Sequence, residues 1–284
     1  MEVLQRRALG ALFVVPPLVI AVILGEPWIA VLVTAIVALA AVEVLRLLRG
    51  AGYPTQLALG VVLAVVVSLA IGVAFRADVD PSLAGAGVLL GAIGLILAGV
   101  GAFVRPDPRD GLAAWMTTVF GALYVSQLGF VVRLGQVAPP VPPDAQLSVL
   151  DATQAWVVLL VLGVWAYDTG AYLVGSRIGG PRFLTHISPS KTYAGLVGGL
   201  VAATVVVAVG LWAVGSSPLH ALALGPLLAL AAQAGDLAES VVKRAAGAKD
   251  SSNLIPGHGG VLDRIDSFLF AAPVVTLYVL AFLG

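Results

Sequence analysis

The sequence predicts an all-α fold, a polytopic membrane helix bundle of about nine transmembrane helices. The chain of 284 residues is 60% hydrophobic and 11% charged, whereas soluble domains carry about 25% charged residues. Its mean hydropathy is +1.05. The apolar residues also gather in runs of roughly 20, which is the length that an α-helix needs to cross a bilayer.

Nine such runs follow one another along the chain. The first follows Arg6 and Arg7, as in a signal peptide, but Gly25, Glu26 and Pro27 offer no small-residue cleavage site, so we expect a retained helix. We divide the chain into an N-terminal membrane part with an outer loop, 1–150, and a C-terminal catalytic part with cytoplasmic loops, 151–284. The expected spans are 8–24, 28–48, 56–75, 82–104, 112–132, 154–176, 193–214, 219–244 and 267–283.

The basic residues predict the orientation of the bundle. Loops that face the cytoplasm carry an excess of Lys and Arg, and only Arg76 and Arg133 fall on one side of the nine-helix arrangement. We therefore expect the N-terminus inside, the C-terminus outside and a location in the cytoplasmic membrane. The proline-rich stretch 133–153 is expected as an irregular outer loop. The residues on the inner side are Arg6, Arg7, Arg46, Arg49, Arg105, Arg109, Arg177, Arg182, Lys191, Lys243, Arg244, Lys249 and Arg264.

Composition also limits the partners. The formal net charge is zero, and the sequence has no basic patch large enough for a nucleic acid. The absence of cysteine excludes disulfides and thiolate ligands but does not identify a compartment.

Charged residues concentrate in one window, 236–266, which is about a tenth of the chain and holds nine of its 30 charged side chains. Asp236, Glu239, Ser240 and Lys243 follow one another at i, i+3, i+4 and i+7, so they share one helix face. They could form an internal ion-pair ladder with Lys243 reaching the surface. Because ionisable groups inside a membrane are costly, we favour Asp236 as a metal ligand and Lys243 as a phosphate contact.

The segment from His258 to Asp266 also has two interpretations. Asp263 could cap the last helix, with Asp266 three residues later in the second position of a motif that resembles a capping box. That reading leaves His258 and the two glycines Gly259 and Gly260 unexplained. Glycines let the backbone approach a ligand closely, and two carboxylates one helical turn apart can hold a hard cation that also bridges phosphate oxygens.

A third polar group follows the sixth span. Asp168 is expected about 10 Å inside the helix end, where an isolated carboxylate is expensive. Ser188 and Lys191 belong to a predicted helix start whose N–H groups would suit a phosphate. We expect the histidines outside the charged window to be incidental, and Glu43 to form a local ion pair with Arg46.

These residues resemble the signature of the phosphatidate cytidylyltransferase family, the CDP-diacylglycerol synthases. The family pattern is a serine, Lys-Arg, Lys-Asp, His-Gly-Gly and Asp-Arg-x-Asp at fixed spacing, and no position departs from it. Weaker similarity covers Tyr167–Tyr172, Ser188–Gly195 and the region of Arg7, Pro16 and Glu43. The matching residues are Ser240, Lys243, Arg244, Lys249, Asp250, His258, Gly259, Gly260, Asp263, Arg264 and Asp266.

The resemblance implies a reaction in which CTP and phosphatidate give CDP-diacylglycerol and pyrophosphate, with Mg²⁺ required and a homodimeric membrane enzyme. A second, monovalent cation and the choice between CTP and dCTP stay open. By this resemblance, Asp236, Asp263 and Asp266 are expected to bind the metal, and these three with Lys243 and His258 form the expected catalytic set. The expected substrate-binding residues are Ser240, Arg244, Lys249, Arg264, Ser188, Lys191, Asp168, Gly259 and Gly260.

Two other functions fit parts of the pattern. A CTP-dependent polyprenol kinase would share the apolar bundle and the nucleotide site but would transfer the γ-phosphoryl group. An ion-coupled transporter would use Asp168 and Asp236 as coupling carboxylates, but it has no need of the basic and glycine-rich run that follows.

Overall fold

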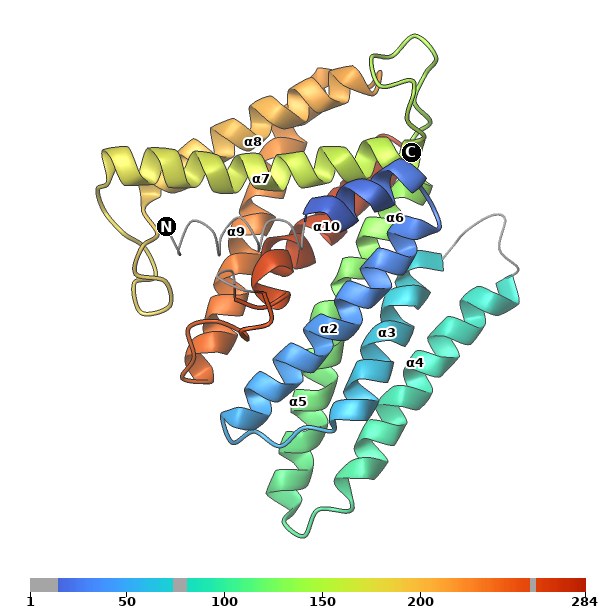
Figure 1. Ribbon diagram of the computed structural model, residues 1–284, viewed down its shortest axis with the longest axis vertical. Coiled ribbons are helices and arrows are strands. Elements are labelled where there is room, and N and C mark those ends of the chain that lie inside the picture. The colour runs from blue at the N-terminus through green and yellow to red at the C-terminus, as the bar shows by residue number, and fades with distance from the viewer. Residues whose placement is uncertain (1–14, 74–80, 256–258) are drawn as a thin grey trace. The chain divides into compact units, whose positions relative to one another are not determined.

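The computed structural model describes residues 15–73, 81–255 and 259–284, and in these ranges the chain is helical (Figure 1). The only β-type pairings among them are two isolated bridges. The first described helix is Val15–Leu24. The labelled α-helices are α2 (Trp28–Gly50), α3 (Leu57–Val73), α4 (Pro81–Ala102), α5 (Pro108–Ser126), α6 (Phe130–Val137), α7 (Ala152–Ile178), α8 (Tyr193–Ala213), α9 (Ala221–Ala245) and α10 (Leu262–Phe282).

Seven described segments are long and apolar enough to cross a membrane. Two shorter apolar helices, Val15–Leu24 and α3, account for the other two predicted runs. The predicted fold class, an all-α polytopic membrane bundle, is therefore confirmed, while the orientation stays a prediction. The seven segments are Trp28–Gly50, Gly85–Ala102, Pro108–Val137, Ala152–Ile178, Tyr193–Ala213, Pro218–Ala245 and Leu262–Phe282.

Several helix ends are set by side chains that the sequence shows directly. Asp107 accepts a hydrogen bond from the backbone N–H of Arg109 at the start of α5. Asp151 and Gln154 form a reciprocal capping box at the start of α7. Such caps satisfy backbone N–H groups that have no partner within the helix. The predicted outer loop is also shorter than the expected stretch 133–153. Helix α6 continues to Val137, and α7 begins at Ala152, so only the residues between them form the irregular connection.

The chain divides into two compact units, and both are discontinuous in sequence. Unit 1 consists of Met1–Arg133 and Val242–Ile265, and unit 2 of Leu134–Val241 and Asp266–Gly284. Both α9 and α10 contribute residues to each unit. The predicted division into residues 1–150 and 151–284 concerns functional roles and stays a prediction.

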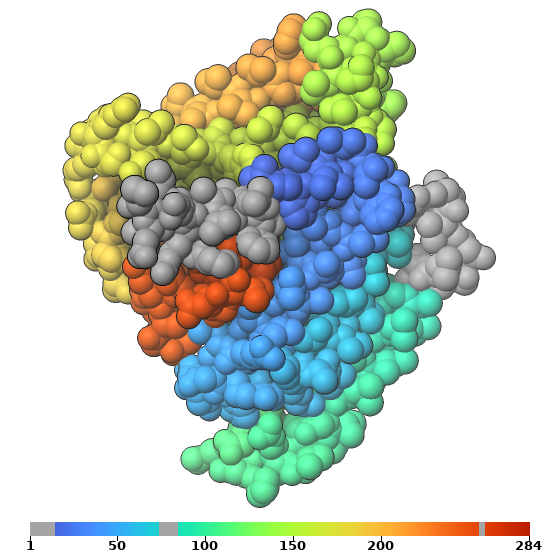
Figure 2. All heavy atoms as spheres, in the orientation of Figure 1, coloured from blue at the N-terminus to red at the C-terminus, as the bar shows by residue number. Residues whose placement is uncertain are grey.

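In unit 1, helices α2, α3, α4 and α5 pack on one another, as Figure 1 shows. Leu45 of α2 is fully buried. A Cβ atom on Gly121 of α5 would lie 2.9 Å from this leucine, and one on Gly60 of α3 would also collide with it. Small residues thus let the helices approach closely, as is typical of membrane bundles. Helix α4 is the least buried span of the described chain, and it forms part of the surface visible in Figure 2.

In unit 2, α7 and α8 lie side by side over most of their length (Figure 1). Their contact is lined by small residues: a Cβ atom on Gly170 of α7 would lie 2.8 Å from the carbonyl oxygen of Gly198 on α8. The opposite face of α8 exposes Val197, Val201 and Val205. These valines repeat every four residues, which is the spacing of one helix face. An exposed apolar stripe on a membrane helix is suited to contact with lipid tails.

Candidate active site

One basic and one acidic residue of the charged window form an ion pair in unit 1. Lys243, near the end of α9, places its Nζ 2.7 Å from Oδ1 of Asp263, in the first turn of α10. The two side chains are 13% and 7% exposed. Because both groups are largely withdrawn from water, each depends on the other for charge compensation.

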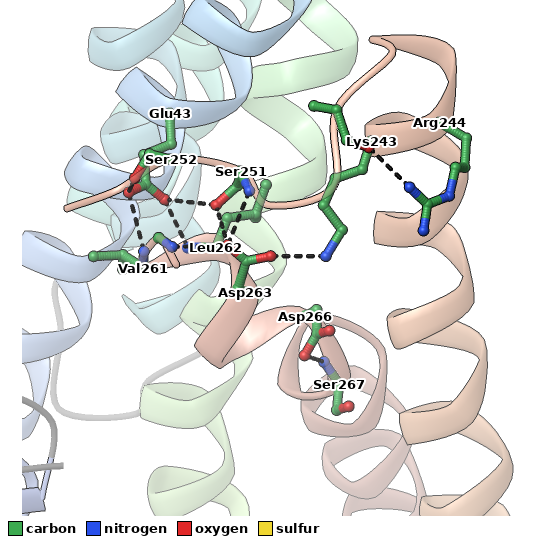
Figure 3. A network of polar contacts seen from close by, with 12 residues as sticks. Glu43, Lys243, Arg244, Ser251, Ser252, Val261, Leu262, Asp263, Asp266 and Ser267 are labelled. Atoms are coloured by element: carbon green, nitrogen blue, oxygen red, sulfur yellow. Dashed lines mark hydrogen bonds and ion pairs between the residues drawn. The ribbon is translucent and has the colours of Figure 1, made fainter. Parts of the chain in front are cut away.

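The second oxygen of Asp263 is also occupied. Oδ2 accepts hydrogen bonds from the backbone N–H of Ser251 at 2.9 Å, the Ser251 hydroxyl at 2.7 Å and the backbone N–H of Gly260 at 2.7 Å (Figure 3). Helix α10 begins at Leu262, so Asp263 lies within the first turn and reaches back to the segment that precedes it. The interpretation of Asp263 as the helix cap is therefore wrong: the residue lies inside the first turn of α10 and binds the loop that precedes it.

A second carboxylate contacts the start of α10. Glu43 of α2 is 6% exposed, and it accepts hydrogen bonds from the backbone N–H groups of Val261 at 3.0 Å and Leu262 at 2.8 Å. The hydroxyl of Ser252 donates to it at 2.6 Å. The expected local ion pair between Glu43 and Arg46 is therefore wrong. The carboxylate points to a segment that is distant in sequence and supplies uncharged donors.

The two glycines of the His-Gly-Gly motif lie against these two carboxylates. A Cβ atom on Gly259 would lie 2.6 Å from Oδ2 of Asp263, and one on Gly260 would lie 2.6 and 2.7 Å from the oxygens of Glu43. Gly259 also has a φ of +79°, which L side chains rarely adopt. The expectation that these glycines let a ligand approach stays a prediction; the groups that approach them in the structure are side chains of the protein itself.

Another ion pair lies in unit 2. Lys191, in the loop between α7 and α8, contacts Oδ2 of Asp236 on α9, and each side chain is 25% exposed. This oxygen is itself buried and makes no hydrogen bond of good geometry within the described part of the chain. The contact is therefore an ion pair only. The loop that carries the predicted Ser188–Lys191 helix start reaches the polar face of α9, although α8 begins later, at Tyr193, with Thr192 as its cap.

Asp236 and Asp266 belong to neighbouring helices of unit 2. A Cβ atom on Gly235 of α9 would lie 3.1 Å from the backbone carbonyl carbon of Asp266 on α10. The two helices thus approach closely one residue away from Asp236. Carboxylate oxygens are the ligands that Mg²⁺ prefers, and Oδ2 of Asp236 is buried without a hydrogen bond, although Lys191 pairs with it. These two residues fit a magnesium site.

Asp263 fits such a site less well, because both of its oxygens already have partners. It lies in unit 1, whereas Asp236 and Asp266 lie in unit 2. Within either unit, the described residues include no group of three or more histidine, aspartate or glutamate side chains placed to hold a metal ion. The expectation of three aspartate ligands around one ion stays a prediction.

The other expected site residues lie on the same elements or beside them. Ser240 is half-buried on α9, and Ser188 is half-buried in the loop before α8. His258 lies outside the described residues. The exposed members of the set are Asp168 on α7, Arg244 on α9, Lys249 in the loop after α9 and Arg264 on α10.

Sequence reasoning missed several polar contacts of these units. Glu43, Ser251 and Ser252 were given no role at the site, although an ionisable residue in an apolar span is itself a signal of one. Tyr167 of α7 and Gln233 of α9 were also missed: the phenol donates a buried hydrogen bond of 2.5 Å to the amide oxygen. The nearby motif Tyr167–Tyr172 and the position of Gln233 one turn before Asp236 could have indicated this pair.

Comparison with known proteins is consistent with this arrangement. Three relatives named phosphatidate cytidylyltransferase are 45% identical over 130 residues in Brucella suis biovar 1 (strain 1330), 42% over 128 residues in a Synechocystis strain, and 42% over 124 residues in Staphylococcus aureus strain COL. The matched stretches cover 43%, 44% and 43% of this chain and 46%, 43% and 48% of the relatives, so less than half of each relative's length is matched. A model of the cytidylyltransferase family matches residues 5–282. The chain therefore belongs to the cytidylyltransferase family.

Proposed function

We propose that the protein transfers the cytidylyl group of CTP to phosphatidate, giving CDP-diacylglycerol and pyrophosphate for phospholipid biosynthesis. The observation that carries this proposal is the family match over residues 5–282, together with relatives named for this reaction. The polytopic helical bundle agrees with it, because one substrate is a membrane lipid.

In the proposed reaction, a phosphate oxygen of phosphatidate attacks the α-phosphorus of CTP, and the bond from that phosphorus to the bridging oxygen of pyrophosphate breaks. A phosphate monoester is already anionic near neutral pH, so the attack requires no strong general base. The protein's contribution is then positioning and charge compensation, as in other phosphoryl transfers.

The two lysine–carboxylate pairs support a role of the protein in positioning and charge compensation. Lys243 is held by Asp263, and an ammonium group has three N–H donors, so one can bind the carboxylate while the group also faces a phosphate. Lys191 is held in the same way by Asp236. We assign Arg244, Lys249 and Arg264 to the remaining phosphate charge, with Ser188, Ser240 and Asp168 beside the substrates.

Asp236 and Asp266 would hold Mg²⁺, with Asp263 as the predicted third ligand. When bound, the ion supplies positive charge to the phosphate oxygens that the two substrates bring together. His258 is proposed to contact a phosphate or to donate a proton to the leaving pyrophosphate. We further propose a homodimer in the cytoplasmic membrane, with the site facing the cytoplasm, where CTP is found.

The direct test follows the α-phosphorus. Purified full-length protein in detergent is incubated with Mg²⁺, phosphatidate and CTP labelled at that position. Label should move into the lipid phase, and pyrophosphate should appear in equal amount. A lipid kinase would instead leave the α-label in aqueous CDP and would move a γ-label into lipid. Retention of the α-label in the aqueous phase would overturn the proposal.

A further inference from the structure

Glu43 is an acidic residue in a membrane span whose role the proposed reaction does not explain. It lies in the second half of α2 and is 6% exposed. Burying a carboxylate is costly unless hydrogen bonds or an opposite charge compensate it. Its partners in the structure are four donors, all supplied by residues 251–262.

These donors fix the beginning of α10. The first N–H groups of an α-helix have no partner within the helix, and their partial positive charge favours an acidic group. Glu43 accepts from the N–H of Leu262, the first residue of α10, and from the N–H of Val261 just before it. A side chain from α2 thus performs the capping role that a local residue usually performs.

The other two donors connect Glu43 to the loop that leads into α10. The Ser252 hydroxyl donates at 2.6 Å to Oε1, and the Ser251 hydroxyl lies 3.3 Å from Oε2. The same Ser251 hydroxyl lies 2.7 Å from Oδ2 of Asp263. A hydroxyl has one proton, so Ser251 donates to one of these two carboxylates at a time, and it lies between the two acids (Figure 3).

The contacts then continue to a cation. Asp263 binds Ser251 and Gly260 through one oxygen and Lys243 through the other. A displacement of the segment that Glu43 holds would therefore move Asp263, and with it the ammonium group of Lys243. Glu43 is connected to the proposed phosphate-binding lysine through packed and hydrogen-bonded groups of unit 1.

The close fit of Gly260 supports the same conclusion independently. A Cβ atom at this position would lie within 2.7 Å of both Glu43 oxygens. The backbone thus approaches the carboxylate at a distance that only glycine permits, and Gly260 is itself buried. Both the carboxylate of Glu43 and the lack of a side chain at Gly260 therefore determine this close contact.

We propose that Glu43 is a positioning residue for cytidylyl transfer: it holds Ser251, Ser252 and residues 260–262 at the start of α10 so that Asp263 and Lys243 keep the geometry that the substrates require. This inference rests on the proposed function. It assigns a role in the reaction to a residue of α2, which contributes no other residue to the proposed site.

The test compares Glu43→Gln and Glu43→Ala with the unaltered protein in detergent. Glutamine retains one acceptor oxygen, whereas alanine retains none, so the loss should be larger for alanine. We expect kcat to fall by roughly 10-fold for glutamine and 100-fold for alanine, since small displacements at a reacting centre have effects of that size. The KM for CTP should change less than about threefold.

A second readout does not depend on activity. Amide hydrogen exchange of residues 259–265 should become faster in both Glu43 variants, while exchange in α3 and α5 stays unchanged. The matched control is Thr34→Ala on the same helix, which removes a hydrogen bond from the Thr34 hydroxyl to the carbonyl of Ala30 and touches none of this segment. It should change neither kcat nor the exchange of residues 259–265.

Ser252→Ala keeps the proposal testable if the Glu43 variants do not fold, because it removes one of the four donors and leaves the buried carboxylate three others. It should give a smaller kcat loss of the same kind with faster exchange at residues 259–265. Unchanged kcat in Glu43→Ala, or unchanged exchange in a folded Glu43 variant, would overturn the proposal. If the unaltered protein transfers no label from CTP, the proposed function fails, and the exchange result alone decides whether Glu43 holds the segment.

Discussion

Lys243 and Asp263 form an ion pair with 2.7 Å between Nζ and Oδ1, and both side chains are mostly shielded from water. Lys243 stands at the end of α9, and Asp263 stands in the first turn of α10. The pair therefore closes the loop of the charged window at its two ends. Its consequences for stability can be measured separately from its part in the reaction.

Replacing Lys243 by methionine should destabilise the protein by about 3 kcal/mol, because a largely buried carboxylate then loses its cation. The measurement is reversible unfolding in mixed detergent micelles. The double variant Lys243→Met with Asp263→Asn should recover part of this loss, since it removes the uncompensated charge. Equal stability of the single variant and the unaltered protein would contradict a structural contribution of this pair.

Gly260→Ala should lower both stability and turnover, because the added Cβ would collide with Glu43 and the Ser251 hydroxyl. We expect a loss of about 1 to 3 kcal/mol, the usual range for overpacking. Gly85→Ala is the matched control, since a Cβ atom there has no other atom within 4 Å and Gly85 lies inside α4. That change should be neutral or stabilise the helix by roughly 0.5 to 1 kcal/mol.

Tyr167→Phe should cost about 1 to 2 kcal/mol, because it leaves the buried amide of Gln233 without the phenol that donates to it. The double variant Tyr167→Phe with Gln233→Leu should be closer to the unaltered protein, since both polar groups are then gone. Thermal unfolding of the purified protein compares the three variants. A double variant that is less stable than the sum of the two single changes would show that the hydrogen bond is not the main contribution.

Removal of divalent cations by a chelator should stop turnover, and added Mg²⁺ should restore it. Asp236→Asn and Asp266→Asn should each lower kcat by about 100-fold or more, as the loss of a charge-stabilising group commonly does. Asp144→Asn serves as the control because Asp144 is exposed in the connection between α6 and α7. Full magnesium-dependent turnover in either of the first two variants would remove that residue from the metal site.

The spans could be predicted because a membrane helix requires a long apolar run, and such runs are visible in the sequence without tertiary information. All nine runs contain an apolar helix in the described chain, although the described parts of two of these helices are shorter than a full span. The sequence did not predict that the chain stays helical past Arg133, as α6, to Val137. The proline cluster that follows suggested an earlier end to the helix than the structure has.

The site was predicted less completely, because spacing along the chain reveals local faces and not contacts between distant segments. Asp236 and Lys243 share one helix face, as predicted, but their ion pairs reach Lys191 and Asp263 on other elements. Glu43 was assigned to Arg46 because the two are three residues apart. Its true partners are more than 200 residues away, and no pattern within one sequence indicates that pairing.

The contact between Glu43 and the start of α10 has a consequence for biosynthesis. Leu262 is the 219th residue that the ribosome adds after Glu43, and reaching it takes on the order of 10 to 40 s at common elongation rates. For most of that interval, until Ser251 is made, the nascent chain carries an acid in α2 without any of its four eventual donors. The inserted intermediate must therefore keep this acid hydrated or protonated, and final assembly waits for the last helix to emerge.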